Sequence, residues 1–398
     1  MNPSASGYDV ERLCAEYGVA LADFEEPELR FGAAMPGLCQ ALEQAIAENS
    51  QQELLEAIEI PLSFVLAQME HIGFYVDKES IRAYGKELEA QVNQLHDEII
   101  EEVGYEFNIN SPKQLGEALF GKLGLPHGKK TKSGWSTNAD VLEELRLLHP
   151  VVDKVLRYRT VAKLKSTYCD GLLKVIGPDG RVHSTFNQTE TRTGRISSAE
   201  PNLQNIPVRT PIGRELRKFF AAEHGLLVDA DYSQIELRVL AHAAQDENMM
   251  AAFRENDDIH RRTASQVFHV PPEMVTPLMR SRAKAVNFGI VYGIGAFSLS
   301  KDIGVTQKEA KQYIDDYLHH FSGVDRYMKE AVEKARELGY AETLFGRRRY
   351  LPELSSKNFN MRSFGERVAR NMPIQGAAAD IIKIAMIRVE ARPSGRRP

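Results

Sequence analysis

The sequence has few cysteines and no long apolar run, and each shortage excludes a class of protein. Its three cysteines, Cys14, Cys39 and Cys169, lie far apart among 398 residues and lack metal-ligand spacing. Disulfides and a structural zinc site are therefore not expected, and a reducing compartment is the simplest interpretation. No stretch of eighteen apolar residues occurs, and the amino terminus lacks a basic patch followed by an apolar segment. We expect a soluble, cytoplasmic protein with no membrane contact, most simply a monomer.

Internal repeats and low-complexity tracts are also missing, and the composition is that of a globular protein. Apolar residues make up 43% of the chain and charged residues 26%, which predicts two or three subdomains. The net charge of −5 is unevenly spread, because residues 1–60 contain twelve acidic and two basic side chains. Residues 61–398 therefore carry a net charge of +5, which permits a nucleic-acid partner.

Hydrophobic periodicity predicts long helical regions interrupted by two short strands. Helices are expected over much of 61–176 and again over 241–340. Alternation over 182–186 and a compact apolar run over 226–231 predict strands. The acidic segment 1–60 is interpreted as a leader or as the remnant of a preceding exonuclease-like domain.

Basic residues recur along the helix predicted to begin near Val151. Such a stripe could follow a phosphate backbone. A solvated helix face explains it equally well, and the residues alone leave both interpretations open. The stripe consists of Lys154, Arg157, Arg159, Lys163 and Lys165.

Acidic residues follow the apolar run Leu226–Val228, and they predict a metal site. A buried strand that ends in a carboxylate at an open sheet edge can hold a hard cation such as magnesium. Asp231 is the best candidate for that ligand. Asp229 precedes it on the same face of the strand, and Asp140 lies in a distant helical region, so neither is assigned to the site.

A second group of residues predicts a nucleotide ligand. Arg280, Lys284, Phe288 and Tyr292 recur every four residues, so on a helix they share one face roughly 18 Å long. The two cations lie toward the helix N-terminus, where phosphate is favoured, and the two aromatic side chains lie where a base could stack. That arrangement suits a nucleoside triphosphate.

Three of the candidate residues also have ordinary structural explanations. Phe288 could be a core aromatic residue, and His260 could be a histidine whose hydrogen bonds are satisfied within a helix. Glu236 lies three residues after Ser233, which fits a capping box at a helix N-terminus. Both a capping role and a ligand role can hold for Glu236.

The motifs taken together resemble those of family A DNA polymerases, in order and at domain-scale spacing, over about residues 56–390. The matching segments are Thr193–Arg195, Asn202–Asn205, Asp231–Glu236, Arg280–Lys284 and Asn287–Gly293.

The resemblance implies an α+β, mostly α fold with the right-hand architecture of thumb, palm and fingers. The palm sheet is expected to be incomplete. The expected divisions are 61–175 for the thumb and the start of the palm, 176–240 for the palm with the metal-binding strand, 241–355 for the fingers, and 356–398 for a partial palm with an aberrant tail.

The resemblance also implies template-directed DNA synthesis by two-metal nucleotidyl transfer, in which magnesium ions clamp the attacking and leaving oxygens. Asp231 would bridge both ions, and the backbone carbonyl of Tyr232 would contact one. Arg280 and Lys284 would hold the triphosphate and stabilise the charge that develops on pyrophosphate. The expected catalytic residues are Asp231, Lys284 and Arg280, and the expected nucleotide-binding residues are Glu236, His260, Phe288, Tyr292 and Gln234.

Glu236 would act as a steric gate against a ribose 2′ hydroxyl, which favours deoxynucleoside triphosphates and disfavours a related single-subunit RNA polymerase. The primer-template would be contacted through its minor groove, where shared acceptors report pair geometry and carry little sequence information. An ordinary polar helix face is the alternative explanation for Arg367, Asn371 and Gln375. The expected DNA contacts are Arg195, Asn202, Gln204, Arg209, Arg367, Asn371 and Gln375.

The carboxyl-terminal sequence departs from the family pattern. The family continues into a His-Asp-Glu motif that supplies a second metal-binding aspartate, whereas residues 391–398 here contain no acid. A shifted reading frame or an artificial end would explain that tail. We therefore expect one carboxylate ligand to be missing, and the alternative function is a fragment that binds primer-template and nucleotide but extends poorly. Unpaired palm elements would also favour aggregation.

Overall fold

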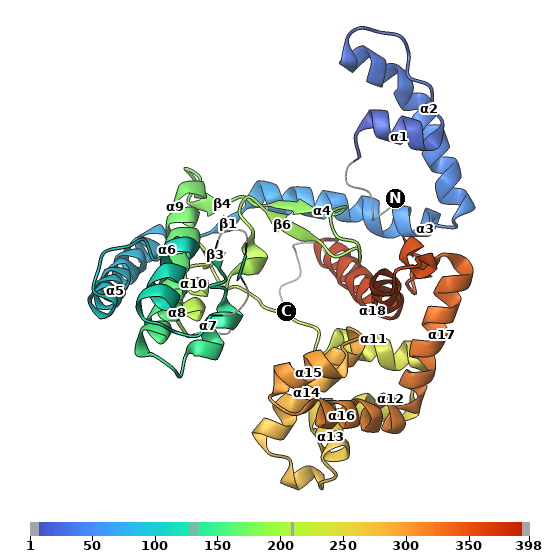
Figure 1. Ribbon diagram of the computed structural model, residues 1–398. Coiled ribbons are helices and arrows are strands. Elements are labelled where there is room, and N and C mark those ends of the chain that lie inside the picture. The colour runs from blue at the N-terminus through green and yellow to red at the C-terminus, as the bar shows by residue number, and fades with distance from the viewer. Residues whose placement is uncertain (1–7, 128–129, 132–133, 208–210, 392–398) are drawn as a thin grey trace. The chain divides into compact units, whose positions relative to one another are not determined.

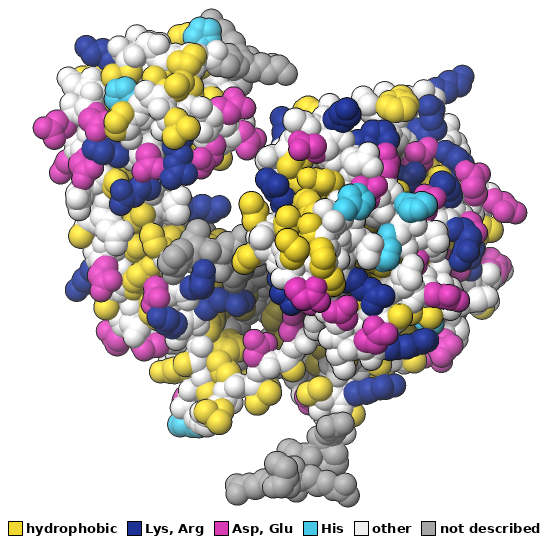
Figure 2. Space-filling model, turned by 90° about the horizontal axis from the view of Figure 1, so that it is seen from below, with side chains coloured by type: hydrophobic (Ala, Val, Ile, Leu, Met, Phe, Trp, Pro, Cys, Tyr) yellow, Lys and Arg dark blue, Asp and Glu magenta, His cyan; other side chains and the backbone are white. Residues whose placement is uncertain are grey.

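The computed structural model describes residues 8–127, 130–131, 134–207 and 211–391. The described residues form two compact units (Figure 1). Unit 1 comprises those within Met1–Gln68, Asn187–Ser197 and Ala230–Pro398, and unit 2 those within Met69–Phe186 and Ser198–Asp229. On the face drawn in Figure 2, acidic and basic side chains are intermingled within each part of the surface.

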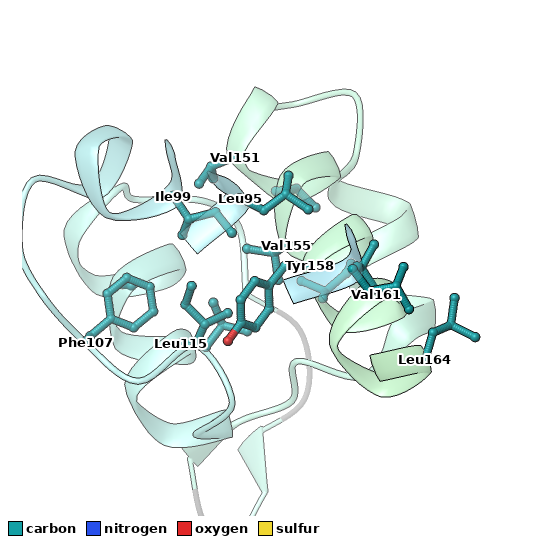
Figure 3. Packing of buried hydrophobic residues seen from close by; sticks show 14 of the residues in the cluster. Leu95, Ile99, Phe107, Leu115, Val151, Val155, Tyr158, Val161 and Leu164 are labelled. Carbon is teal, nitrogen blue, oxygen red and sulfur yellow. The ribbon is translucent and has the colours of Figure 1, made fainter. Parts of the chain in front are cut away.

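Unit 2 is built around two long helices that pack against each other, α5 (Lys78–Val103) and α8 (Pro150–Lys163). The Asp77 side chain caps α5 by accepting a hydrogen bond from the Ser80 amide at 3.0 Å, and Gly104 ends the helix at a φ of 84°, which glycine adopts without steric cost. Leu95 and Ile99 of α5 meet apolar residues of α8 in one buried core (Figure 3). The smaller helices of this unit are α6 (Pro112–Gly116), η2 (Glu117–Lys122), α7 (Ala139–Leu145), η3 (Leu164–Asp170), α9 (Gly171–Val175), η4 (Leu203–Asn205) and α10 (Pro211–Arg217).

The predicted basic stripe lies on α8 and η3, and three of its members have partners within unit 2. Lys154 pairs with Glu98 and Glu102 of α5. Arg159 donates to the Thr137 hydroxyl at 3.1 Å, and Lys165 lies 3.1 Å from a carboxylate oxygen of Asp170. These contacts give part of the stripe a role in packing the unit.

The strands in the described residues form only two-stranded sheets. The apolar alternation over 182–186 becomes parts of two short strands. The pairs are β1 (Phe74–Tyr75) with β4 (Arg181–Val182), β2 (Lys130–Thr131) with β3 (Gly134–Trp135), β5 (Thr185–Asn187) with β6 (Ser197–Ala199), and β7 (Tyr340–Glu342) with β8 (Arg348–Tyr350).

The strand predicted over 226–231 is wrong for this structure. The segment has no regular secondary structure, and Leu226 and Val228 are 92% and 91% exposed. A β-strand satisfies its backbone only by pairing with a neighbour, and none of the strands in the described parts of the chain pairs with this one. The apolar run therefore lies in water, where burial cannot stabilise it.

Unit 1 is helical, as the periodicity over 241–340 predicts. Its largest core gathers Leu237, Leu240, Val286 and Tyr317 with residues of the final helix such as Ala377. Its helices are α1 (Val10–Tyr17), α2 (Pro27–Glu48), α3 (Gln52–Leu54), η1 (Leu55–Glu59), α4 (Ile60–Ile72, which ends in unit 2), α11 (Ile235–Ala244), α12 (Glu247–Arg254), α13 (Ile259–Val267), η5 (Pro272–Met274), α14 (Pro277–Val291), α15 (Ala296–Ile303), α16 (Gln307–His320), α17 (Ser322–Leu338), η6 (Pro352–Ser355) and α18 (Phe359–Glu390).

A cluster of four charged side chains joins η1, the segment between β7 and β8, and α18 within unit 1. The Arg347 guanidinium lies 2.6 Å from a carboxylate oxygen of Asp380 and also pairs with Glu59. Lys383 lies 2.8 Å from Glu59. Asp380 and Lys383 are 0% and 1% exposed, and burial raises the pKa of Asp380 against the pull of Arg347. Removing one member of such a buried group leaves the opposite charge uncompensated, which is strongly destabilising.

All three cysteines are free, with Cys14 and Cys169 buried and Cys39 exposed. Among the described helices, none combines the length and the apolar character needed to cross a lipid bilayer.

Candidate nucleotide-binding site

Helix α14 presents the predicted row of cationic and aromatic side chains on one face. Pro277 occupies the start of the helix, and the Thr276 hydroxyl caps it by accepting from the Met279 amide at 3.2 Å. Arg280 and Lys284 are exposed and Phe288 is half-buried. Tyr292, which ends the helix, is 44% exposed. The helix and its face are therefore as the four-residue spacing predicts.

Arg280 is held at the N-terminus of the neighbouring helix α13. Its Nε atom lies 2.6 Å from Oδ2 of Asp258, while Oδ1 of Asp258 accepts from the backbone amides of His260 and Arg261. Burial raises the pKa of the Asp258 carboxyl, but the Arg280 hydrogen bond and these amides bring it below its ordinary value. Asp258 was missed as a site residue. Two aspartates directly before a helical pattern were the available signal, because aspartate is a favoured N-cap.

His260 lies beneath the same face, with 3% of its surface exposed. Its ring centroid is 5.8 Å from that of Phe288. Burial lowers the pKa of His260 to about 4, and the nearby charges of Arg280 and Lys284 act in the same direction against Asp258. The imidazole is therefore neutral at pH 7.

Glu236 links three segments of unit 1. It is buried on the first turn of α11, pairs with the Arg195 guanidinium, and accepts a hydrogen bond from the Tyr292 hydroxyl at 3.0 Å. Burial, followed by the Glu236 charge, raises the pKa of Tyr292. Arg195, Glu236 and Tyr292 are thus brought together as one hydrogen-bonded group.

The capping box predicted for Glu236 is not formed. Gln234 and not Ser233 occupies the N-cap position of α11, with a φ of 55° and no side-chain capping bond. A residue in the left-handed conformation does not present its side chain to the helix amides as an extended N-cap does. Glu236 is therefore free to face Arg195 and Tyr292.

Three predicted residues of α18 lie beside the end of α14. The Asn371 side chain donates to the Val291 carbonyl at 3.0 Å. Arg367 packs against Gly293, where an added Cβ would come within 3.1 Å of its Cγ, and Gln375 hydrogen-bonds Tyr292. These residues pack against and hydrogen-bond to the aromatic end of the α14 face.

The remaining predicted DNA contacts are Asn202, Gln204 and Arg209. Asn202 and Gln204 belong to unit 2, where the Asn202 side chain caps η4 by accepting from the Gln204 amide at 3.0 Å. Arg209 lies outside the described residues.

The predicted metal ligands belong to no cluster of metal-binding side chains among the described residues. Asp231 and Tyr232 are exposed, and Tyr232 is 51% exposed. Across the described ranges, no group of three or more His, Cys, Asp or Glu side chains is placed to hold a metal ion. These side chains do not by themselves fit a two-metal centre.

Comparisons with known proteins agree with the helical architecture. A family model described as DNA polymerase family A matches residues 78–396, and the chain belongs to that family. The chain is similar to DNA polymerase I of Bacillus subtilis, with 49% identity over 98% of this chain and 47% of the relative. It is also 52% identical to DNA polymerase I of Geobacillus stearothermophilus, over 92% of this chain and 43% of the relative.

A solved structure has a closely similar fold. The POL domain of Pol1 from M. smegmatis, in complex with DNA primer-template and dNTP, superposes with a TM-score of 0.89 at 41% identity, covering 98% of this chain and 69% of that one. The expectation of a mostly helical right-hand polymerase fold is thereby confirmed. The chain spans about half the length of the curated relatives it matches.

Proposed function

We propose that this chain binds primer-template DNA and a deoxynucleoside triphosphate for template-directed DNA synthesis. The observation that carries the proposal is the exposed face of α14, where Arg280 and Lys284 lie above the buried, neutral His260. The similar M. smegmatis domain was solved with DNA primer-template and dNTP, which supports the same class of ligand here. Family membership supports the same reaction.

In this proposal the two cations of α14 hold the triphosphate, and they stabilise the negative charge that develops on the leaving pyrophosphate. Phe288 lies beside the sugar and Tyr292 near the templating pair. Glu236 excludes a 2′ hydroxyl, and its contacts with Arg195 and Tyr292 hold it in one position. Gln234 completes the proposed nucleotide contacts.

DNA binding in this proposal uses residues of unit 1 that contact the nucleotide face, together with the other predicted contacts. Arg195 pairs with Glu236. The end of α14 is contacted by Arg367 and Gln375. Binding of the primer terminus by these side chains would therefore affect residues of the nucleotide face. The remaining proposed contacts are Asn202, Gln204, Arg209 and Asn371.

Magnesium enters the proposal through one pair of ligands. Asp231 with the Tyr232 carbonyl is the proposed ligand pair, and the described side chains add no cluster around them. A hard cation needs several oxygen ligands. This observation favours the second candidate function, a chain that binds primer-template and nucleotide but extends a primer poorly.

One experiment separates the two candidates. The chain is titrated with a labelled primer-template, then with the next correct deoxynucleotide opposite the template base, and extension is followed at increasing magnesium concentration. Binding of both ligands with extension supports synthesis, and binding without extension supports the second candidate. Failure to bind primer-template would overturn both. A parallel titration with ribonucleotides tests the expected preference for deoxynucleotides.

A further inference from the structure

A buried chain of polar side chains connects α13 to α14 directly behind the nucleotide face. Thr263 and Asn287 are both 0% exposed, and His260 is 3% exposed. The Thr263 hydroxyl donates to the Asn287 carbonyl oxygen at 3.1 Å, and the Asn287 amide nitrogen lies 3.1 Å from His260 Nδ1. Such an arrangement is costly unless each group meets a complementary partner.

The direction of these hydrogen bonds determines which ring nitrogen of His260 carries the proton. The Asn287 carbonyl oxygen accepts from Thr263, and its NH₂ group faces His260. An NH₂ group can only donate. A donor requires an acceptor, and neutral Nδ1 is an acceptor only when the proton is on Nε2. An imidazolium would set an N–H against this NH₂ group and would leave both without an acceptor.

We propose that Thr263 and Asn287 are positioning residues that hold His260 in the neutral tautomer with its proton on Nε2, so that the ring offers one N–H donor beside Arg280 and Lys284. Within the described part of the chain, no protein acceptor is recorded for Nε2, so that donor is available to a ligand. The part of the inference that concerns the triphosphate rests on the proposed function. The tautomer itself does not.

The charged groups around the ring explain why a neutral donor suits this position. Asp258 faces His260 from the start of α13, and Arg280 and Lys284 face it from α14. Asp258 already neutralises Arg280 in part. A third cation would be repelled by the other two in the free protein, whereas a neutral N–H donor can bind a phosphate oxygen without that cost. The lowered pKa of the ring agrees with this geometry.

The test reads the tautomer directly. The full chain is labelled with ¹⁵N-histidine, and its two ring nitrogens are distinguished by their couplings to the carbon-bound ring protons. His260→Gln assigns the signal. We expect a protonated Nε2 and an unprotonated Nδ1 in the free protein, unchanged between about pH 5.5 and 8. Thr263→Val should mix the tautomers because the amide loses its orientation, and Thr263→Ser should restore the wild-type signal.

Nucleotide binding supplies a second, separable readout. Thr263→Val should weaken correct deoxynucleotide binding by up to about tenfold, the value of one ordinary hydrogen bond, and Thr263→Ser should not. A wild-type ring protonated on Nδ1, or Thr263→Val spectra identical to wild type, would overturn the inference. If the tautomer is as expected but no nucleotide binds, the inference stands and the proposed function fails. If Thr263→Val does not fold, the wild-type spectrum alone decides.

Discussion

On the helix pair α13 and α14, the candidate side chains are held by neighbours in the same unit, as Arg280 is by Asp258 and His260 by Asn287. The segment 226–232 carries the candidate metal ligand Asp231, but it is irregular and largely exposed. A helix satisfies most of its backbone internally, whereas a strand depends on a partner that is distant in sequence. The side chains of the nucleotide face are thus held by contacts between α13 and α14. The segment that carries Asp231 pairs with none of the described strands.

We expect the largest loss of stability where a charged side chain is paired in the interior of unit 1. Arg347→Met removes the cation that faces both Asp380 and Glu59, and it should lower the free energy of unfolding by about 3–5 kcal/mol because it leaves the buried Asp380 carboxylate without its paired cation. Arg326→Met is the matched control, since among the described residues it forms an ion pair with Glu330 alone, a 3.9 Å contact at the surface, worth less than about 1 kcal/mol. Urea unfolding measures both, and equal losses would contradict the distinction.

The second prediction uses pH to test the burial of His260. Because burial lowers the pKa of His260 from 6.5 to about 4, the unfolded chain binds more protons than the folded chain between those values. Stability from this residue is therefore fully present above about pH 6.5 and is lost as the pH falls toward 4, on the order of 3 kcal/mol in total.

The stability difference between wild type and His260→Gln measures this effect. It should shrink as the pH is lowered from 7 to 5. His224→Gln, at an exposed histidine, should show no such change. A wild-type advantage that is the same at both pH values would show that the ring titrates normally.

The third prediction concerns binding through the exposed cations of α14. Lys284→Ala should weaken binding of the correct deoxynucleotide roughly 10- to 100-fold, the value of a charge-assisted hydrogen bond, with little change in thermal stability. Lys308→Ala, at an exposed lysine of α16, is the control. Fluorescence titration of the primer-template complex gives both affinities, and the proposed role fails if the two variants bind equally well.

A smaller effect is expected where one side chain only holds another. Tyr292→Phe removes the 3.0 Å hydrogen bond to Glu236 but leaves the Arg195 pair. If Glu236 excludes a 2′ hydroxyl, preference for deoxynucleotides over ribonucleotides should fall about two- to tenfold. Tyr350→Phe, which removes a 3.3 Å contact with Asn49, should leave the preference unchanged. Competition between the two sugars measures the ratio.

The sequence alone predicts the helical half of the site better than the rest. The four-residue spacing from Arg280 to Tyr292 is local, so it identifies both the helix and its exposed face. Asn287 lies in the same helix and begins one of the matching segments, but the sequence assigns it no role, because only the packing of α13 shows that it meets His260. The apolar run 226–228 was assigned to a strand on local pattern alone, and pattern cannot supply a pairing partner.

We expect the smallest change in the free energy of unfolding at Asp231, in contrast to the large loss expected at Arg347. Asp231 is exposed and makes no ion pair among the described residues, so Asp231→Asn should change the free energy of unfolding by no more than about 0.5 kcal/mol. Any magnesium-dependent primer extension should nevertheless fall strongly, because the amide cannot replace a negatively charged oxygen ligand. Binding of primer-template without magnesium should be unaffected. A variant that is destabilised but still extends primers would mean that Asp231 belongs to the fold and not to the metal site.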